Sequence, residues 1–186
     1  MEKKYSIAFY TSETIIVLVK AMKEKLFEKV RWFNSKNSVA HITICEFIAT
    51  DTAIEIIKNK LKLLCDTFEP FEVYLNGFDS YSNGAFVITP NEDSKIKLKV
   101  IMKKVTKSLR SIKTKKSSAP HISIARKLKP DNFEIAKHLF TTVNTSFLCD
   151  TIVLREYNPI ITQFFITNTF KFNNNSQPEF IQGKLF

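Results

Sequence analysis

Two short segments of this chain repeat one pattern of side chains that suits phosphate chemistry. Residues 38–44 read Ser-Val-Ala-His-Ile-Thr-Ile, and residues 118–124 read Ser-Ala-Pro-His-Ile-Ser-Ile. In each segment a hydroxyl residue follows a histidine by two places, so an extended strand would put both side chains on one face. Imidazole moves protons near neutral pH, and a hydroxyl can donate to a phosphate oxygen. Two such strands that face one groove predict a site for phosphoester chemistry.

The composition indicates a compact globular protein with anionic partners. A chain of 186 residues can form one domain or two small lobes, and it buries roughly 70% of its unfolded surface. Hydrophobic residues make up 44% of it and include 17 phenylalanines, which is ample core material. The formal net charge of +10 favours nucleotides, RNA or acidic surfaces as partners.

The cysteines and the lengths of the apolar segments indicate the cellular compartment. The three cysteines have no metal-like spacing, and no histidine stands at a finger-like interval from them, so we expect no metal site. The N-terminus lacks the long apolar region of a signal peptide, and no stretch has the apolar length that spans a bilayer. We therefore expect a cytoplasmic protein with free thiols and no membrane association.

The periodicity of apolar residues predicts an α+β fold. We expect strands at 5–10, 39–48, 71–78, 84–89, 147–155 and 163–172 and around the second motif, and helices after Thr11, at 52–67, at 93–111 and from Pro130 to about Phe140. Residues 79–83 have the composition of a hairpin turn. This order is typical of mainly antiparallel sheets with outer helices. The motif strand near the middle of each half indicates two similar lobes with a central cleft, in one domain over residues 1–186, and residues 173–186 are expected to form a loosely ordered tail.

At this point the motifs resemble a known family, the 2H phosphoesterases, which include 2′,5′ RNA ligase-like proteins and cyclic phosphodiesterases. The family pattern is a pair of His-x-Thr/Ser motifs, each followed by a hydrophobic residue, at about the separation seen between residues 41–44 and 121–124. The expected element order extends the resemblance over nearly the whole chain. The resemblance implies a bilobal α+β fold with pseudo-twofold symmetry, whose two motifs line a central cleft without a metal or cofactor.

The resemblance also implies roles for five residues. His41 and His121 would transfer protons, and Thr43 and Ser123 would hold the phosphate. Family members often carry an arginine five residues after the second histidine, where Arg126 stands. Strict strand alternation would turn Arg126 away from the site, so its phosphate-binding role requires a bulge or a strand end there.

The implied reaction is hydrolysis of a 2′,3′-cyclic phosphate or a 2′,5′-phosphodiester in RNA or a nucleotide, which can run backwards as 2′,5′ RNA ligation. In-line attack needs one neutral imidazole as base and one protonated imidazole as acid on opposite sides of the phosphorus atom. For hydrolysis we expect His41 to donate the proton and His121 to accept it.

We expect the enzyme to be a monomer whose partner is its RNA or nucleotide substrate.

Several other residues have ordinary structural interpretations. We interpret His138 as a surface or packing residue of a helix. Cys45 continues the face of His41 and Thr43 by alternation, and we interpret it as a small buried residue of the cleft floor rather than a nucleophile. The lysines of residues 95–116 form a solvated helix face or guide RNA phosphates, and the sequence leaves both interpretations open. Tyr10, Trp32, Tyr81 and Tyr157 are candidates for stacking on a base, and the sequence does not select among them.

A second function of another class stays open at this stage. A protein that binds RNA or a nucleotide without turning it over would keep the same cleft. The enzyme is favoured because all four motif positions carry reactive side chains.

Overall fold

The computed structural model describes residues 1–175, and the expected tail from residue 176 onward lies outside them. The strands within the described residues are β1 (Glu2–Tyr10), β2 (His41–Thr50), β3 (Phe71–Tyr81), β4 (Ala85–Pro90), β5 (Thr114–Lys116), β6 (Ile122–Ala125), β7 (Thr145–Cys149), β8 (Thr151–Asn158) and β9 (Gln163–Lys171). The helices are α1 (Glu13–Val30), α2 (Asp51–Asp66), α3 (Glu92–Ser108) and α4 (Pro130–Leu139). The expected α+β class is confirmed, and none of these helices has the length and hydrophobicity that a membrane crossing requires.

The helices begin where the sequence supplies a cap. Ser12 accepts a hydrogen bond from the Ile15 amide at the start of α1, and Thr50 accepts one from the Ala53 amide at the start of α2. Such side-chain oxygens satisfy amides that have no partner inside the helix. Asn91 caps α3 in the same way, through the Ser94 amide at 2.9 Å. The expected cap before α1 is therefore present.

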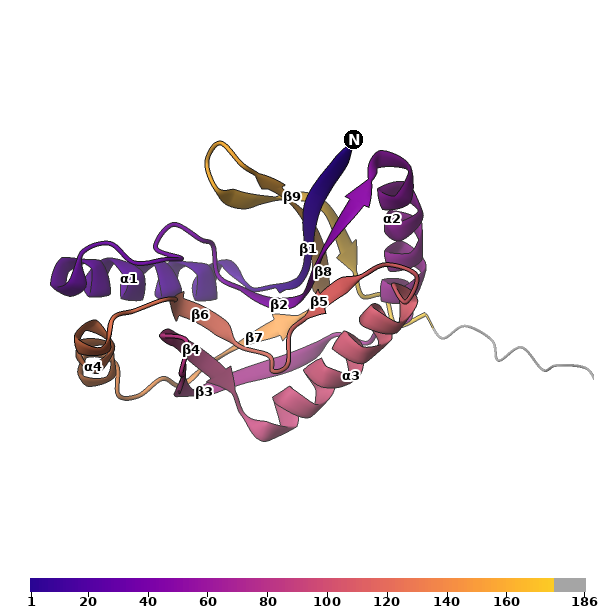
Figure 1. The fold of residues 1–186 in the computed structure, drawn as a ribbon. Helices are drawn as coiled ribbons and strands as arrows, with labels where there is room; N and C mark the ends of the chain where they lie inside the picture. Colours follow the sequence, from indigo (N-terminus) through magenta and orange to yellow (C-terminus); the bar gives the residue numbers. More distant parts are fainter. Residues whose placement is uncertain (176–186) are drawn as a thin grey trace, which may run out of the picture.

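The strands form one antiparallel sheet whose two halves meet at the motif strands. Its order is β7-β3-β4-β6-β2-β1-β8-β9, with β5 paired to β2 beside β6. β2 and β6 are thus the central pair, each with three further strands on its outer side. Figure 1 shows the sheet curling, with α1 and α4 near one end and α2 and α3 near the other. This arrangement is the pseudo-symmetric two-lobed sheet that the repeated motif predicts.

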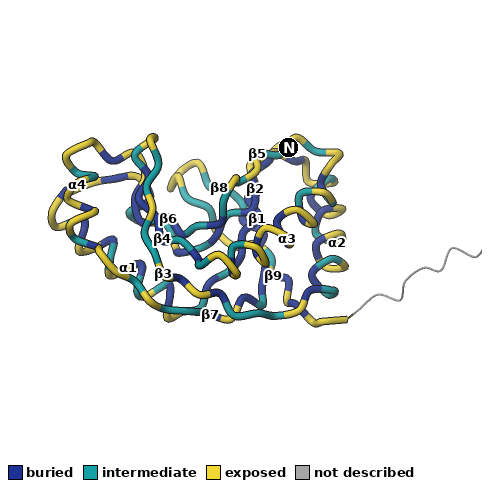
Figure 2. The backbone as a smooth tube through the Cα atoms, turned by 90° about the horizontal axis from the view of Figure 1, so that it is seen from below, coloured by how far each residue is buried: buried dark blue, intermediate teal, exposed yellow. Residues whose placement is uncertain are grey.

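The hydrophobic core lies between the helices and one face of the sheet. Ile42 and Ile122 of the motif strands belong to the same buried cluster as Ile15 of α1, Ile57 of α2 and Leu98 of α3. Figure 2 shows buried residues concentrated on the strands and on the inward sides of the helices. Because strand side chains alternate, the motif histidines and hydroxyls lie on the other face, which we call the motif face.

One expected element is wrong. The apolar pattern predicts a single strand over 147–155, but the chain leaves β7 at Cys149 and enters β8 at Thr151. β7 pairs with β3 in one half of the sheet, whereas β8 pairs with β1 in the other half. Asp150 alone makes this crossing, and it accepts hydrogen bonds from Thr151 and from Lys171 at 2.6 and 2.9 Å.

Residues 173–175 are fastened to the end of α2. The side chains of Asn173 and Asn175 donate to the Asp66 carboxylate at 2.7 and 3.1 Å, and the Asn174 amide donates to the Phe68 carbonyl. The part of the expected loose tail that the structure describes is therefore bonded to the body of the protein.

Candidate active site

The central strand pair brings the two motifs side by side. Ile42 of β2 is the direct antiparallel partner of Ile122 of β6. Alternation from that pair puts His41 across from Ser123 and Thr43 across from His121, all on the motif face. The two histidines are then diagonal neighbours, whose Cα atoms in such a pair lie about 7–8 Å apart. All four side chains are partly exposed, so a ligand on this face can reach them.

Both imidazoles are held in the same orientation by the backbone just before them. His41 Nδ1 lies 2.6 Å from the Val39 carbonyl, and His121 Nδ1 lies 2.9 Å from the Ala119 carbonyl. A carbonyl only accepts, so Nδ1 is the protonated nitrogen of each neutral ring. Nε2 is therefore the atom of each ring that is left to take or give a proton at a substrate. The two motifs repeat this arrangement as well as their sequence.

A β-bulge in β2 redirects the residues after the first motif. Ala8 of β1 pairs with Thr43, whereas Ile7 pairs with Cys45, so the register shifts by one residue between them. Ile44 and Cys45 consequently both face the core and are fully buried, and Glu46 returns to the motif face. The expectation that Cys45 shares the face of His41 is wrong for this reason. Burial also raises the pKa of the Cys45 thiol to about 12, so this thiol is not a nucleophile.

A second bulge at the matching place in β6 brings Arg126 to the motif face. Val87 of β4 pairs with Ser123, whereas Phe86 pairs with Ala125. Ile124 and Ala125 are both fully buried, and the next side chain, that of Arg126, returns to the face of Ser123. This is the bulge that a phosphate-binding role of Arg126 requires. Glu46 and Arg126 thus occupy equivalent positions after the two motifs.

A loop between α1 and β2 supports both motif strands. The Arg126 amide donates to the Asn34 carbonyl at 3.0 Å, and the Ser35 hydroxyl donates to the Ile124 carbonyl at 3.2 Å. From α1, the buried Lys23 ammonium donates to the Ser35 and Ser38 carbonyls at 2.9 and 2.6 Å. Residues 31–40 are therefore fixed between the helix and the two strands.

The electrostatic surroundings lower the pKa of both histidines. Burial is the largest cause at each ring. At His41 the next cause is the positive charge of Arg155, and the pKa lies well below the ordinary 6.5. The charge of Arg126 lowers the pKa of both His41 and His121, which shows that one cation acts on the two imidazoles.

Arg155 is a residue of this face that reasoning from the sequence missed. It lies in β8, is only 8% exposed, and donates from Nη2 to the Ser6 hydroxyl at 2.8 Å. A signal was present, because Arg155 interrupts the apolar run 152–154 of a strand. Its proximity to His41 could not be read from that run, since the two residues are far apart in the chain.

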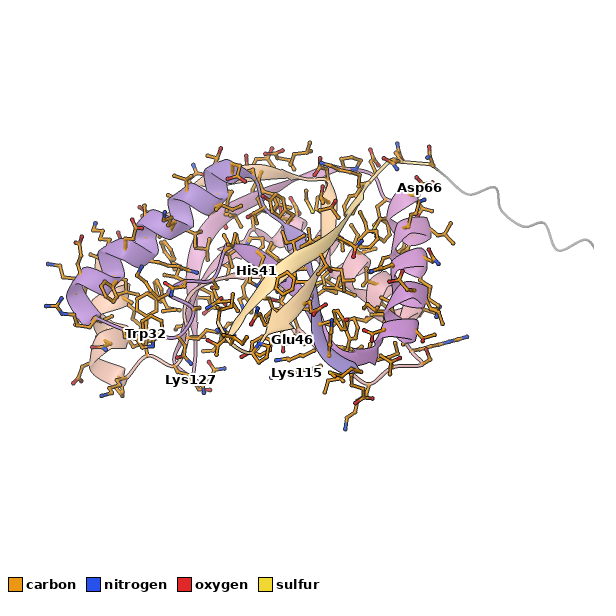
Figure 3. The ribbon with its side chains drawn as sticks, turned by 90° about the horizontal axis from the view of Figure 1, so that it is seen from above. Trp32, His41, Glu46, Asp66, Lys115 and Lys127 are labelled. Carbon is orange, nitrogen blue, oxygen red and sulfur yellow. The ribbon has the colours of Figure 1, made fainter. Side chains whose placement is uncertain are left out.

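Two of the four candidate aromatic residues lie beside the histidines. Tyr10 of β1 is the register partner of His41 and donates its hydroxyl to Glu13 at 2.9 Å. The Tyr81 ring lies 5.5 Å from the His121 ring, centroid to centroid. Trp32 is 63% exposed in the loop after α1, and Figure 3 shows it well to one side of His41. Tyr157 packs against Phe164, with 5.2 Å between the ring centroids, so Tyr10 and Tyr81 are the two candidates with a direct relation to a motif histidine in the structure.

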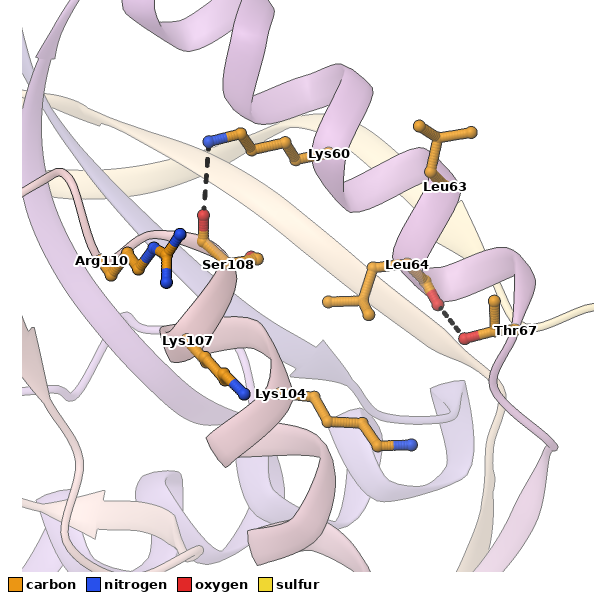
Figure 4. A pocket seen from close by; sticks show the side chains of 8 residues that line it. All are labelled: Lys60, Leu63, Leu64, Thr67, Lys104, Lys107, Ser108 and Arg110. Carbon is orange, nitrogen blue, oxygen red and sulfur yellow. Dashed lines mark hydrogen bonds between the residues drawn. The ribbon is translucent and has the colours of Figure 1, made fainter. Parts of the chain in front are cut away.

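Other candidate groups lie elsewhere. His138 is exposed on α4. Within residues 1–175, no three His, Cys, Asp or Glu side chains gather closely enough to hold a metal ion. A basic groove of about 710 Å³ lies between α2 and α3, and Lys60, Lys104, Lys107 and Arg110 line it (Figure 4). The helices that form this groove pack on the core face of the sheet, so the groove is separate from the motif face.

Comparison with known proteins gives a family and a fold. The sequence profile of the 2′-5′ RNA ligase superfamily matches residues 16–159. Escherichia coli LigT in complex with 3′-AMP superposes with a TM-score of 0.65 at 13% identity, over 92% of this chain and 98% of that chain. The protein TT0787 of Thermus thermophilus gives 0.66 at 14% identity, over 93% and 100%. A protein described as a phosphoesterase gives 0.56 at 12% identity, over 91% and 98%. No match was found among curated proteins.

Proposed function

Because this chain belongs to the 2′-5′ RNA ligase superfamily, we propose that it is a metal-independent phosphoesterase acting on a 2′,3′-cyclic phosphate or a 2′,5′-phosphodiester of RNA or a nucleotide. The observation that carries the proposal is the pairing of two identically oriented imidazoles with two hydroxyls on one sheet face. Structural relatives support nucleotide ligands, since E. coli LigT has been crystallised with 3′-AMP and with ATP. A 2′,5′ RNA ligase activity would use the same groups with a ribose 5′-hydroxyl in place of water. That hydroxyl attacks the cyclic phosphate, the bond from phosphorus to the 3′-oxygen breaks, and the acid imidazole protonates the 3′-oxygen.

The proposed reaction needs two proton transfers across one phosphorus atom. Water attacks the phosphorus atom while the base imidazole takes its proton at Nε2. The bond from phosphorus to the ribose oxygen breaks, and the acid imidazole donates its Nε2 proton to that oxygen. Each transfer contributes about 10²- to 10⁴-fold. Exchange with solvent then restores the two protonation states.

The phosphate oxygens would be held by the groups between the histidines. Thr43 and Ser123 would donate their hydroxyl protons to these oxygens, which their position on the face of the histidines supports. Arg126, whose charge acts on both rings, would add positive charge. Such preorganised donors stabilise charge that develops on the oxygens in the transition state.

The acid and base assignment is open to a specific test. Burial and the charge of Arg126 lower the pKa of both imidazoles. We propose the roles expected from the sequence, with His41 as the acid and His121 as the base in hydrolysis. A phosphodiester with a p-nitrophenol leaving group needs no acid. The alanine variant of the acid should therefore keep its rate on that substrate, whereas the variant of the base should lose it.

The main experiment measures turnover of nucleoside 2′,3′-cyclic phosphates and 2′,5′-linked dinucleotides in EDTA. We expect His41→Ala and His121→Ala each to lower kcat by about 10²-fold or more. His138→Ala, which removes an exposed imidazole on α4, is the matched control and should retain the wild-type rate. Binding without turnover across the panel would instead indicate a non-catalytic nucleotide-binding protein.

We also propose that the protein works as a monomer in the cytoplasm. Its three cysteines are buried free thiols, which suits a reducing compartment.

A further inference from the structure

Arg155 is a buried cation with unused hydrogen-bonding capacity. Its side chain makes one hydrogen bond, from Nη2 to Ser6 Oγ at 2.8 Å. The Nε atom is buried and has no partner among residues 1–175. Burying a charged group is costly unless it is paired, and buried donors without partners are uncommon in folded proteins. The described part of the protein therefore leaves this buried guanidinium with an unpaired donor.

The strand register puts Arg155 on the motif face. Arg155 is the direct partner of Ser6 in β1, and Ser6 shares its face with Ala8, two residues along. Ala8 is in turn the partner of Thr43. Thr43, Ala8 and Val153 are paired across β2, β1 and β8. Arg155 lies two residues from Val153, which is about 7 Å along the strand. Its charge acts on His41, as expected for a group on the same side of the sheet.

The groups around Arg155 leave a net positive charge. Glu46 faces it from β2, but the Glu46 carboxylate is already paired with the Lys4 ammonium at 2.7 Å. Lys4 Nζ and Arg155 Cζ both lie 5.3 Å from the centre of the Phe164 ring. Lys4, Glu46 and Arg155 together thus carry a net charge of +1.

We propose that Arg155 binds a second phosphate of the substrate, the one that precedes the scissile phosphate along an RNA chain. This inference deepens the proposed function and rests on it. The guanidinium fork can meet two oxygens of one phosphate at once. A phosphate there would neutralise the surplus charge. Once the guanidinium turns toward the ligand, it would also supply the partner that the buried Nε lacks. The hydrogen bond to Ser6 brings the Arg155 guanidinium over β1, where Ser6 is the diagonal neighbour of Thr43. Diagonal neighbours lie about 7–8 Å apart, which is close to the separation of neighbouring phosphates in an extended strand.

The test compares two substrates that differ by one phosphate. They are adenosine 2′,3′-cyclic phosphate and the same nucleotide with an added 5′-phosphate. We expect the wild-type protein to prefer the 5′-phosphorylated substrate. Because removing the Arg155 charge also changes the pKa of His41, the two substrates are compared as the ratio of their kcat/KM values at the pH optimum of each protein. We expect Arg155→Met to lower this ratio about tenfold to hundredfold. Equal losses on both substrates, or no loss on either, would overturn the proposal.

Lys3→Met is the matched control. This variant removes a cation from the same end of β1 as Lys4. Lys3 lies on the opposite face of the sheet from Lys4 and pairs with Glu156 at 2.9 Å. The Lys3→Met variant should prefer the 5′-phosphorylated substrate as strongly as the wild-type protein does. If Arg155→Met does not fold, Arg155→Lys carries the same comparison, because it keeps the charge and loses the fork. A full wild-type preference in Arg155→Lys would then contradict the proposal.

Binding separates this inference from the proposed catalysis. Calorimetry with adenosine 3′,5′-bisphosphate and with 3′-AMP requires no turnover. We expect the bisphosphate to bind more tightly than 3′-AMP to the wild-type protein, and the two ligands to bind about equally to Arg155→Met. If catalysis is absent but this difference holds, the proposed reaction fails and the second phosphate site stands. Equal binding of the two ligands to the wild-type protein contradicts the site.

Discussion

The two histidines make the same kind of backbone contact, but the charges around them differ. Each Nδ1 is held by the carbonyl two residues earlier, so the rings present the same nitrogen to the motif face. The charges around the two rings differ. Arg155 and Lys23 lower the pKa of His41, whereas Asp79 partly offsets the lowering at His121. Proton transfer in both directions requires one ring with and one ring without a proton. Unequal charged surroundings are what separate the pKa values of two identical side chains.

The pH dependence of kcat/KM should reflect these lowered pKa values. Both imidazoles lose their protons below the ordinary value of 6.5, so the singly protonated state becomes scarcer as the pH rises past that point. We expect a bell-shaped profile whose maximum lies on the acid side of pH 6.5, measured with a cyclic mononucleotide. A plateau that continues to alkaline pH would exclude the two-imidazole mechanism.

At the scale of elements, the site depends on segments that brace the motif strands. The loop of residues 31–40 carries the Val39 carbonyl that orients His41, and it bonds to β6 through Asn34 and Ser35. The hairpin turn at Gly84 bonds to the segment after Arg126, since the Leu128 amide donates to the Gly84 carbonyl at 2.9 Å. Asn34 and Gly84 brace the site through backbone carbonyls, whereas Ser35 braces it through its hydroxyl.

Lys23→Met should loosen the loop before His41. The variant loses three hydrogen bonds from Lys23 Nζ, to the Ser35 carbonyl and to the carbonyl and hydroxyl of Ser38. Burial lowers the pKa of Lys23 to about 7, so the comparison is made at about pH 6, where the ammonium form prevails. Hydrogen bonds from charged groups are worth about 1.5–3 kcal/mol each, and the buried methionine offsets part of the loss. We expect about 2 kcal/mol lower stability in urea unfolding and a lower kcat. Lys20→Met, at an exposed position of the same helix, should change neither, and a stable, fully active Lys23→Met would show that the loop needs no such tether.

Gly84→Ala should strain the turn that supports Arg126. Gly84 has a φ of 76°, and a Cβ there would lie 2.6 Å from the Leu128 carbonyl oxygen. Backbone in this region costs a residue with a side chain about 1–3 kcal/mol. We expect a loss of stability of about that size, together with reduced kcat/KM. At Gly77 the nearest atom to a Cβ is the Thr89 hydroxyl oxygen at 3.1 Å, which can rotate away, so Gly77→Ala is the control. Equal unfolding midpoints of the two variants would contradict this account.

The sequence predicts elements and repeats well, and it does not show where strands change register. The motifs, the helices and the pairing of the two halves follow from residue types and periodicity. The bulge after His41 has no local signal, so alternation puts Cys45 on the wrong face. The crossing at Asp150 was missed because one residue without glycine or proline separates β7 from β8. Arg155 was missed because its neighbours Ser6 and Glu46 reach it only through strand pairing.

At the scale of the whole molecule, positive charge extends beyond the motif face. The net charge is +10, and a basic groove lies between α2 and α3. That groove is on the helix side of the sheet, so a mononucleotide on the motif face does not contact it. Only a longer RNA strand that passes around the molecule could use both regions.

The dependence of activity on salt tests this distribution of charge. We expect kcat/KM for an RNA oligonucleotide that ends in a 2′,3′-cyclic phosphate to fall more steeply with salt than that for the mononucleotide. The slope of log kcat/KM against log salt should steepen by about 0.7 for each further phosphate contact. Lys104→Gln with Lys107→Gln should leave the mononucleotide rate unchanged. If the oligonucleotide slope is also unchanged, the lysines of the groove are a solvated helix face.

The crossing at Asp150 has a consequence for how a ligand enters. The two halves of the sheet are already joined at the centre by β2 and β6, and the chain joins them again through one residue between β7 and β8. Two connections between the halves oppose a swing of one half away from the other. For the proposed nucleotide substrate we therefore expect free and bound forms that differ by side-chain rotations rather than by domain closure.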